Sequence, residues 1–336
     1  MIKVVELGRA GDGMAVRALG AAPTPEGIVQ EGRITDPQAV GRVLREVLAR
    51  SGTRARQAVA SVNGQVAIVR EIRLPSLPLA ELKQAARFEV ERYLPYPIAE
   101  VTYDTFVTGE SKDGGNTRLD VLVVAARSDV LGQHVEALRS AGLEPLVLDV
   151  ELFALARAMA MAQPPDQAVM YIHIGAEYTA IVIVSGGMPR VMRSVAFGGK
   201  TITRLLADRM GIAPDKAEAL KLQMSASEPG AATPEALQLQ EVVMAGLGDL
   251  TTEVRRSLDY YGGRYRGVAP DRVVVTGGSA LLPGLTRYLA TDLDMSVEVG
   301  DPFLGLTPAP VPSGDSMPGP AMAVAVGLAR RGADEP

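Results

Sequence analysis

Short apolar runs with strand character alternate with helical patterns along nearly the whole chain, which is typical of an α/β protein. Apolar residues at 40, 43, 44, 47 and 48 predict an amphipathic helix that Asp36 caps and that ends before Gly52. We expect later strands at 146–150, 169–174, 179–184 and 190–196, and helices at 151–162, 200–210, 214–224 and about 234–266.

Two strand pairs and an insertion organise the first half. The glycine-rich "GRAGDG" predicts a turn between "IKVVEL" and "MAVRALGA", and Asn63-Gly64 predicts a second hairpin within "QAVASVNGQVAIVREIRLP". Residues 74 to about 145 have the pattern helix, strand, strand, helix and are bounded by prolines. We therefore expect them to form an inserted unit.

Composition excludes several classes of protein. With 336 residues and 47% apolar residues, the chain can bury a large core in two domains or one two-lobed fold. A net charge of -5 gives no general attraction to nucleic acid or anionic lipid. The absence of cysteine and the presence of only two histidines disfavour a disulfide framework and a zinc site, which fits a reducing cytoplasm. No apolar run reaches the roughly 20 residues of a membrane span, and we expect no signal peptide.

Three glycine-rich turns are candidates for ligand binding. "HIGAEYT", residues 173–179, lies between two apolar strands, so Gly175 is expected to adopt positive φ and let backbone N–H groups approach an anion. A purely structural hairpin explains this motif equally well.

"FGGKT", residues 197–201, opens a helix, but Ser194 stands where a phosphate loop of the Walker type needs glycine. The free N–H groups of a helix N-terminus still favour an anion. In "VVVTGGSALLPGL", a strand ends at Gly277 and Gly278, and Ser279 is expected to cap the next helix. That turn lets a flat or charged ligand lie against the backbone, although a tight strand-to-helix turn is the alternative.

A second candidate site is the aromatic stretch "FEVERYLPYP", residues 88–97. We expect it to receive a short peptide on Tyr93, Leu94, Pro95 and Tyr96, since the prolines hold this part in an extended turn. The alternative is that these side chains form the core of the inserted unit, which we favour for Phe88.

The order of these segments resembles the actin-like ATPase superfamily, in which two related lobes clamp a nucleotide between glycine hairpins. Within it, the chain resembles the family of the type IV pilus assembly protein PilM over essentially its whole length. The segments that carry the resemblance are "IKVVEL", "EVERYLPYPIAEVTYDTF", "VLVVAAR", "AGLEPLVLDVELFALARA", "RSVAFGGKTITRLLA", "KAEALK", "VVVTGGSALLPGL" and "AMAVAVGLARR".

The resemblance implies an α/β, actin-like two-lobed fold of duplicated RNase H-like domains, with an inserted small α+β subdomain. The implied parts are the start of the first lobe at 1–73, the small subdomain beside the partner groove at 74–145, the crossover with the phosphate hairpin at 146–185, the second lobe at 186–270, and its end with the closing helix of the first lobe at 271–336.

The resemblance also implies a nucleotide site for ATP or ADP. Gly175 and Thr179 would donate to phosphate, Glu218 would meet the ribose and Lys221 the base. Lys3 would reach toward the phosphates, and Gly277, Gly278 and Ser279 would form the adenosine turn. Gly198 and Gly199 are included in the predicted site because they open the helix that begins at "FGGKT". For Glu218 and Lys221, a solvated ion pair at spacing (i, i+3) is the simpler explanation.

Two departures from the family pattern matter. His173 stands where the family usually has an aspartate that positions hydrated Mg²⁺, and a neutral imidazole is a poor ligand for Mg²⁺. We expect His173 to be a hydrogen-bonded residue with a structural role. The chain also begins inside the family's first hairpin, so we expect the natural protein to begin about ten residues earlier, because a strand would otherwise lack its neighbour.

The implied function is that of a cytoplasmic adaptor of the type IV pilus inner-membrane assembly platform, peripheral to that membrane through its partners. It would bind the N-terminal cytoplasmic tail of a bitopic PilN-like membrane protein, act with other platform components, and serve pilus-dependent processes such as twitching motility or competence. We expect no catalytic residue, at most weak ATPase activity, no nucleic-acid binding and no direct membrane insertion.

Two alternatives stay open. A Mg-dependent ATPase or sugar kinase-like phosphotransferase needs a carboxylate base, for which the sequence offers no persuasive candidate. A filament-forming membrane tether of the cell-division type needs an amphipathic C-terminal helix, whereas this chain ends in "ARRGADEP".

Overall fold

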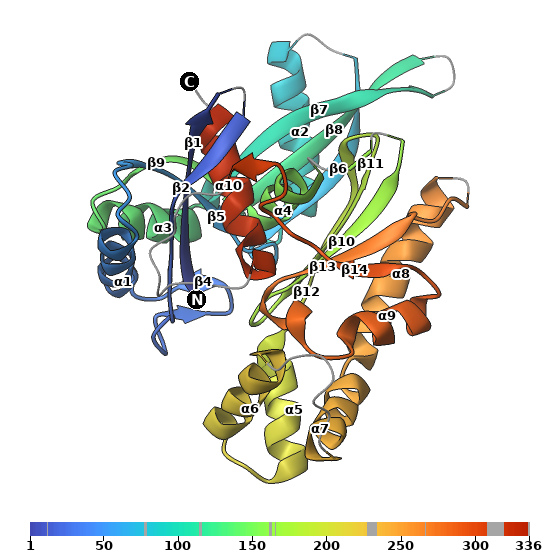
Figure 1. Cartoon of the computed structure of the whole chain (residues 1–336). Coiled ribbons are helices and arrows are strands. Elements are labelled where there is room, and N and C mark those ends of the chain that lie inside the picture. The colour runs from blue at the N-terminus through green and yellow to red at the C-terminus, as the bar shows by residue number, and fades with distance from the viewer. Residues whose placement is uncertain are drawn as a thin grey trace. The chain divides into compact units, whose positions relative to one another are not determined.

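The chain forms two compact units in the computed structural model (Figure 1). Unit 1 comprises Met1–Pro23, Glu46–Ala55 and Glu151–Pro336, and unit 2 comprises Thr24–Arg45 and Arg56–Val150. The structure describes residues 1–11, 13–76, 79–113, 116–160, 163–164, 166–226, 234–265, 267–307 and 319–334. None of the helices in these ranges combines the length and the hydrophobicity that crossing a bilayer requires.

A five-stranded sheet forms the centre of unit 1. Its order is β12 (Met188–Val195), β11 (Thr179–Ser185), β10 (Ala168–Ile174), β13 (Arg272–Thr276) and β14 (Val297–Val299). β10 and β11 are an antiparallel hairpin, whereas β10 and β13 run parallel. Every residue of β10 is buried, which explains why this strand is a nearly continuous apolar run in the sequence.

Helices cover both faces of this sheet. The large core combines the sheet with α5 (Gly199–Met210), α6 (Pro214–Ala226), α7 (Pro234–Ala245), α8 (Gly248–Arg264) and α9 (Leu285–Leu293). The helix α4 (Glu151–Met159) also lies on the sheet, and α10 (Ala323–Asp334) packs on α4. The helices α4 and α10 approach each other closely at Gly327. A Cβ atom at that position would lie 1.8 Å from the Ala154 carbonyl oxygen.

Unit 1 also contains the sheet formed by β1 (Ile2–Ala10), β2 (Gly13–Ala22) and β15 (Leu306–Thr307). β1 and β2 pair antiparallel as predicted from the glycine-rich turn between them. This hairpin places Lys3 in the same unit as the central sheet.

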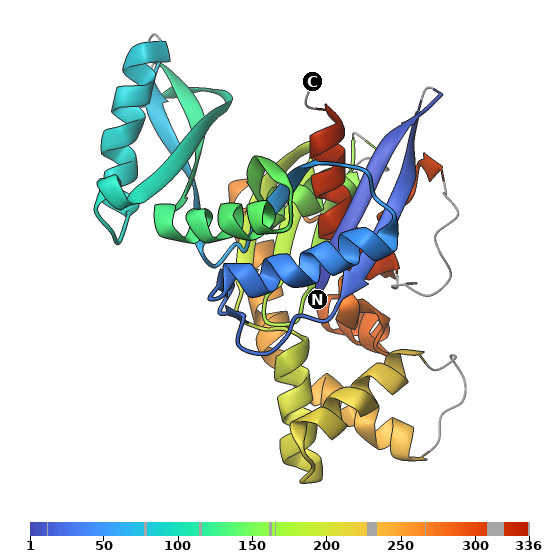
Figure 2. The same cartoon turned by 90° about the vertical axis from the view of Figure 1, so that its left-hand side faces the viewer.

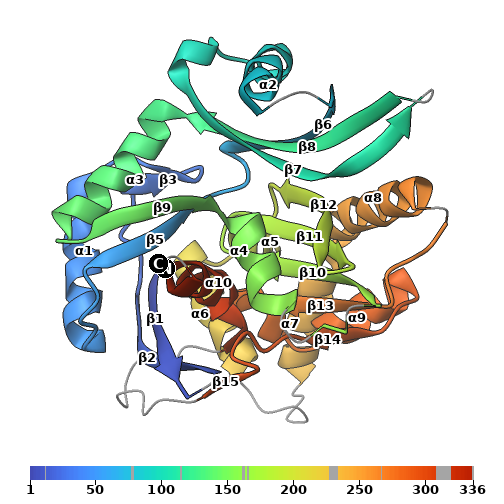
Figure 3. The same cartoon turned by 90° about the horizontal axis from the view of Figure 1, so that it is seen from above.

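Unit 2 contains a three-stranded antiparallel sheet with its own core (Figure 3). The order is β6 (Ala67–Pro75), β8 (Asn116–Arg127) and β7 (Val101–Asp113), and α2 (Leu79–Tyr93) covers one face. The other elements are β3 (Val29–Gln30), β4 (Arg33–Ile34), β5 (Gln57–Val62), the 3-10 turn η1 (Ile98–Glu100), α3 (Ser128–Ser140) and β9 (Glu144–Val150). Figure 2 shows α3 alongside α1 (Pro37–Ser51).

Several predictions of local structure are confirmed. The order α2, β7, β8, α3 is the predicted helix, strand, strand, helix pattern. At the start of α1, the Ala39 N–H donates to the Asp36 carboxylate at 2.9 Å, and Gly52 after its end has φ of 71°. The predicted domain boundaries remain predictions; the compact unit that holds 74–145 also takes in Thr24–Arg45 and the chain from Arg56.

Two predictions of local structure are wrong. The strands on either side of Asn63-Gly64 do not pair with each other, because β5 pairs with β9 and β6 pairs with β8. The predicted helix at 234–266 is two helices, α7 and α8, separated at Gly246 and Leu247. A Cβ atom at Gly246 would lie 2.3 Å from Leu205 Cδ1, so this junction packs closely against α5.

Candidate functional site

The predicted hairpin loop "HIGAEYT" joins β10 and β11. The Gly175 N–H donates to the Tyr178 carbonyl oxygen at 3.0 Å. Gly175 does not have positive φ, so the predicted conformation is wrong. Glycine is required for a different reason: a Cβ atom there would lie 2.9 Å from the Tyr178 carbonyl oxygen. The Thr179 hydroxyl is buried and donates to the Phe197 carbonyl oxygen at 2.8 Å, so donation to a phosphate requires it to leave that partner.

The first turn of α5 lies on this loop. The N–H groups of Gly199 and Lys200 donate to the carbonyl oxygens of Gly175 and Ala176, at 2.9 and 2.7 Å. The expectation that these N–H groups are free is therefore wrong, because the neighbouring loop supplies their acceptors. A Cβ atom at Gly198 would lie 2.6 Å from the Ala176 carbonyl oxygen, so the glycine permits this close contact.

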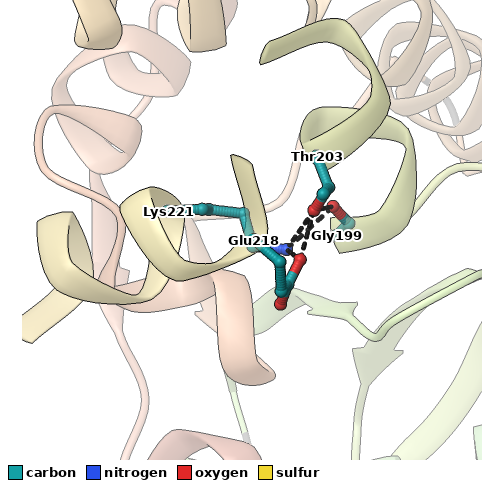
Figure 4. A network of polar contacts seen from close by, with 4 residues as sticks. All are labelled: Gly199, Thr203, Glu218 and Lys221. Carbon is teal, nitrogen blue, oxygen red and sulfur yellow. Dashed lines mark hydrogen bonds and ion pairs between the residues drawn. The ribbon is translucent and has the colours of Figure 1, made fainter. Parts of the chain in front are cut away.

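A polar network joins α6 to the same turn (Figure 4). The Lys221 ammonium donates to the Gly199 carbonyl at 3.0 Å, to the Thr203 hydroxyl at 2.7 Å and to a Glu218 carboxylate oxygen at 2.6 Å. Thr203 also hydrogen bonds to that carboxylate. The side chain of Lys221 is only 9% exposed, whereas that of Glu218 is 42% exposed. The pair therefore differs from a solvated ion pair, because the buried Lys221 fixes Glu218 while the Glu218 side chain stays partly exposed.

The turn after β13 packs on the end of β10. Gly277 has φ of 94°, and a Cβ atom there would lie 2.2 Å from the Ile174 carbonyl oxygen. Its N–H donates to the Pro320 carbonyl oxygen at 2.8 Å. A Cβ atom at Gly278, in contrast, would have no neighbour within 4 Å. Gly277 is therefore required by the backbone, while Gly278 borders open space.

Ser279 does not cap a helix, contrary to the prediction. It lies within the short 3-10 turn η3 (Gly278–Leu281), and α9 begins after Gly284. The intervening Pro283-Gly284 turn delays the helix, so the serine is too far from its first N–H groups. Ser279 is instead buried, with its hydroxyl oxygen 3.0 Å from the Cβ position of Gly199.

Lys3 and His173 approach this region from β1 and β10. The Lys3 ammonium donates to the Ala321 carbonyl oxygen at 2.5 Å, and burial lowers the pKa of Lys3 to about 8. The ring of His173 is buried and its Nδ1 lies 3.0 Å from the Thr276 hydroxyl. Burial, reinforced by the charge of Lys3, lowers the pKa of His173 to about 3. His173 is thus a hydrogen-bonded, neutral side chain, as the sequence suggested.

Several of the predicted glycines and polar residues of unit 1 lie close together in the structure. Gly175 contacts Gly199, which adjoins Ser279 and Lys221, while Gly277 lies against the end of β10. Two residues of this site were missed from the sequence, Thr203 and Thr276. Thr203 lies one helical turn after Gly199, and Thr276 directly precedes the glycine pair, so their spacing was the available signal.

The candidate peptide stretch lies in unit 2. Tyr93 is 51% exposed at the end of α2, and the Arg127 guanidinium lies 5.0 Å from the centre of the Tyr96 ring. Leu94 packs against the core of the three-stranded sheet. Phe88 is 63% exposed, so its predicted place in that core is wrong. The helix turns Phe88 outward because Ala86 and Val90 occupy its buried face.

Comparisons with known proteins identify the family. A family model described as type IV pilus assembly protein PilM matches residues 1–333. A solved structure described as the PilM-PilN type IV pilus biogenesis complex is 33% identical, with a TM-score of 0.85, covering 99% of this chain and 95% of that chain.

More distant structures share the fold. The ethanolamine utilization protein EutJ from Carboxydothermus hydrogenoformans is 16% identical, with a TM-score of 0.56 and coverage of 98% of this chain and 90% of its own. MreB5 of Spiroplasma citri bound to ADP is 13% identical, with a TM-score of 0.51 and coverage of 95% and 79%. These likenesses confirm the predicted actin-like α/β fold. The family match over residues 1–333 and the 33% identity to the PilM-PilN structure establish that the chain belongs to the family of the type IV pilus assembly protein PilM.

Proposed function

We propose that this chain is an adaptor of the type IV pilus inner-membrane assembly platform that binds an adenine nucleotide and the N-terminal tail of a PilN-like membrane protein. The observation that carries the nucleotide part is the direct contact among the hairpin loop, the first turn of α5, the α6 network and the β13 turn. One structure of the same fold, MreB5, is described as bound to ADP, and another of the same family is described as a complex with PilN. The adaptor acts in the cytoplasm and reaches the inner membrane through its partners.

Within this site, Glu218 is the residue that recognises ribose. Its carboxylate is held by Lys221 and Thr203, yet its side chain remains partly exposed. A carboxylate accepts hydrogen bonds from the two ribose hydroxyl groups. Lys221 uses its three N–H groups within the protein, so it acts on the nucleotide by positioning Glu218.

The test is the dissociation constant for ADP, measured by isothermal titration calorimetry. Glu218→Gln keeps the size of the side chain but removes the charge that accepts from ribose. We expect ADP affinity to fall about tenfold or more, since a hydrogen bond to a charged group contributes about 1.5–3 kcal/mol.

A matched control is Glu89→Gln, which breaks an (i, i+3) ion pair with Arg92 in unit 2. We expect this change to leave ADP affinity unaltered. Equal affinities for wild type and Glu218→Gln would remove Glu218 from the site. Rapid steady-state ATP hydrolysis would favour the enzymatic alternative over the adaptor.

A further inference from the structure

We infer that Arg127 is a positioning residue of the proposed tail site, and that it acts by holding the ring of Tyr96 in place for the bound peptide. This inference rests on the proposed binding of a PilN-like tail at Tyr93–Tyr96 and assigns a role to a residue outside that stretch. The contacts that support it lie within unit 2.

The tail-binding stretch needs support from other elements. Tyr96 lies between Pro95 and Pro97, in the connection from α2 to η1. A proline has no N–H group to donate, so this connection forms few hydrogen bonds of its own. The ring of Tyr96 is only partly buried, so packing alone does not fix its orientation.

The register of the small sheet brings Arg127 to this ring. Arg127 is the last residue of β8, and it pairs with Val101 at the start of β7. Tyr96 precedes Val101 by one short turn, η1, and the Arg127 guanidinium lies over its ring, 5.0 Å from the ring centre. The π electrons of an aromatic face attract a cation in this position. Arg127 thus covers one face of the ring and leaves the opposite face for an apolar side chain of the tail.

Asp129 fixes the guanidinium in turn. The Nε and Nη2 groups of Arg127 donate to the two carboxylate oxygens of Asp129, at 2.9 and 2.7 Å. Asp129 lies in the first turn of α3, where its carboxylate also accepts from the Val130 N–H at 2.8 Å. Two parallel hydrogen bonds orient the plane of a guanidinium group, which a lysine ammonium cannot reproduce. The start of α3 therefore holds Asp129, Asp129 holds Arg127, and Arg127 holds Tyr96.

This ion pair has little to contribute to the stability of the fold. The side chain of Arg127 is 30% exposed and that of Asp129 is 56% exposed. Exposed pairs of this kind add little to the free energy of unfolding. Variants of Arg127 should therefore fold normally, which allows their effect on binding to be measured.

The experiment measures, by fluorescence anisotropy, the binding of a labelled synthetic PilN-like tail peptide to the full chain. Arg127→Lys keeps the charge but loses the planar pair with Asp129, so we expect the dissociation constant to rise about tenfold. The matched control is Arg73→Lys, which alters another arginine–aspartate pair of the same sheet, with Asp120 at 3.3 Å. We expect this control to change the dissociation constant by less than about twofold.

A double-mutant cycle tests whether Arg127 acts through the ring. Tyr96→Leu removes the aromatic face and keeps an apolar side chain. In a Tyr96→Leu protein, Arg127→Lys should weaken binding by less than about twofold more, because the ring that Arg127 holds is absent. Denaturant unfolding of Arg127→Lys should give the same midpoint as the wild type, which separates positioning from a role in folding.

The outcomes have distinct meanings. Equal affinities of wild type and Arg127→Lys overturn this inference and leave the proposed tail binding standing. Equal weakening by Arg73→Lys, a full additional loss in the Tyr96→Leu protein, or a lower unfolding midpoint that accounts for the lost affinity also overturns it. Absence of peptide binding by the wild type overturns the proposed tail binding, and this inference with it.

Discussion

Lys3 is a residue whose proposed role in binding phosphate would come at the expense of stability. Its ammonium is partly buried and donates to one carbonyl oxygen, and desolvation lowers its pKa from 10.5 to about 8. A lowered pKa means that the fold disfavours the charged form relative to the unfolded chain. The charged Lys3 therefore lowers the free energy of unfolding at neutral pH, and a bound phosphate would offset this loss.

Lys3→Met should raise the free energy of unfolding of the nucleotide-free protein by about 1–3 kcal/mol at pH 7. Between pH 8 and 10.5 the unfolded wild type binds more protons at this position than the folded one, so wild-type stability rises with pH there. The advantage of the variant is thus full below pH 8 and fades toward pH 10.5. Urea titrations at several pH values measure this difference.

The exposed Lys216 provides the comparison. Lys216→Met should change the free energy of unfolding by less than about 0.5 kcal/mol and without this pH dependence. A Lys3→Met protein that is less stable than the wild type at every pH would contradict the assigned cost of burying the charge.

At the scale of elements, the site is built by backbone segments that approach one another too closely for side chains. The hairpin loop supplies carbonyl oxygens to the first turn of α5, and the β13 turn lies on the end of β10. Glycines 198 and 277 stand at these two contacts. Glycine is needed at these two positions for the loops to pack against each other, as well as for the proposed binding of a ligand.

Gly277→Ala should lower the free energy of unfolding by about 2–4 kcal/mol. The added Cβ would lie 2.2 Å from the Ile174 carbonyl oxygen, and φ of 94° is unfavourable for alanine. Gly278→Ala is the matched control, because its Cβ position has no neighbour within 4 Å and its φ is not in the left-handed region. Denaturant unfolding compares the two, and equal losses of stability would refute the stated role of Gly277.

At the scale of the whole molecule, the two proposed binding surfaces belong to different compact units. The nucleotide residues lie in unit 1, which has the large core, and the stretch Tyr93–Tyr96 lies in unit 2, whose small core includes Val90 and Val121. Each surface is thus supported by a core of its own. A change on one should leave local structure on the other intact.

Tyr93→Ala should weaken binding of a synthetic PilN-like tail peptide about tenfold and leave ADP affinity unchanged. The reason is that Tyr93 exposes a large aromatic surface without supporting the core of unit 2. Fluorescence anisotropy with a labelled peptide measures the effect. The control is Phe106→Ala, an equally exposed aromatic residue on β7, and equal weakening by both variants would show that the stretch has no special role.

Local features of this protein could be predicted from the sequence because they depend on residues near one another in the chain. The Asp36 cap, the β10–β11 hairpin and the order of elements in 79–140 follow from apolar spacing and turn residues. The ordered set of motifs was also enough to indicate the family, which the match over residues 1–333 confirms. The residues of the candidate nucleotide site could be predicted because they lie within these motifs.

How these local features pair and pack with one another is determined by the tertiary structure alone. β5 pairs with β9 and not with its neighbour β6, and the junction between α7 and α8 at Gly246 packs against Leu205 of α5. Likewise, the first N–H groups of α5 are taken by the hairpin loop, and Lys221 is buried as a support for Glu218. These outcomes depend on contacts between residues far apart in the chain, which local periodicity and turn chemistry do not encode.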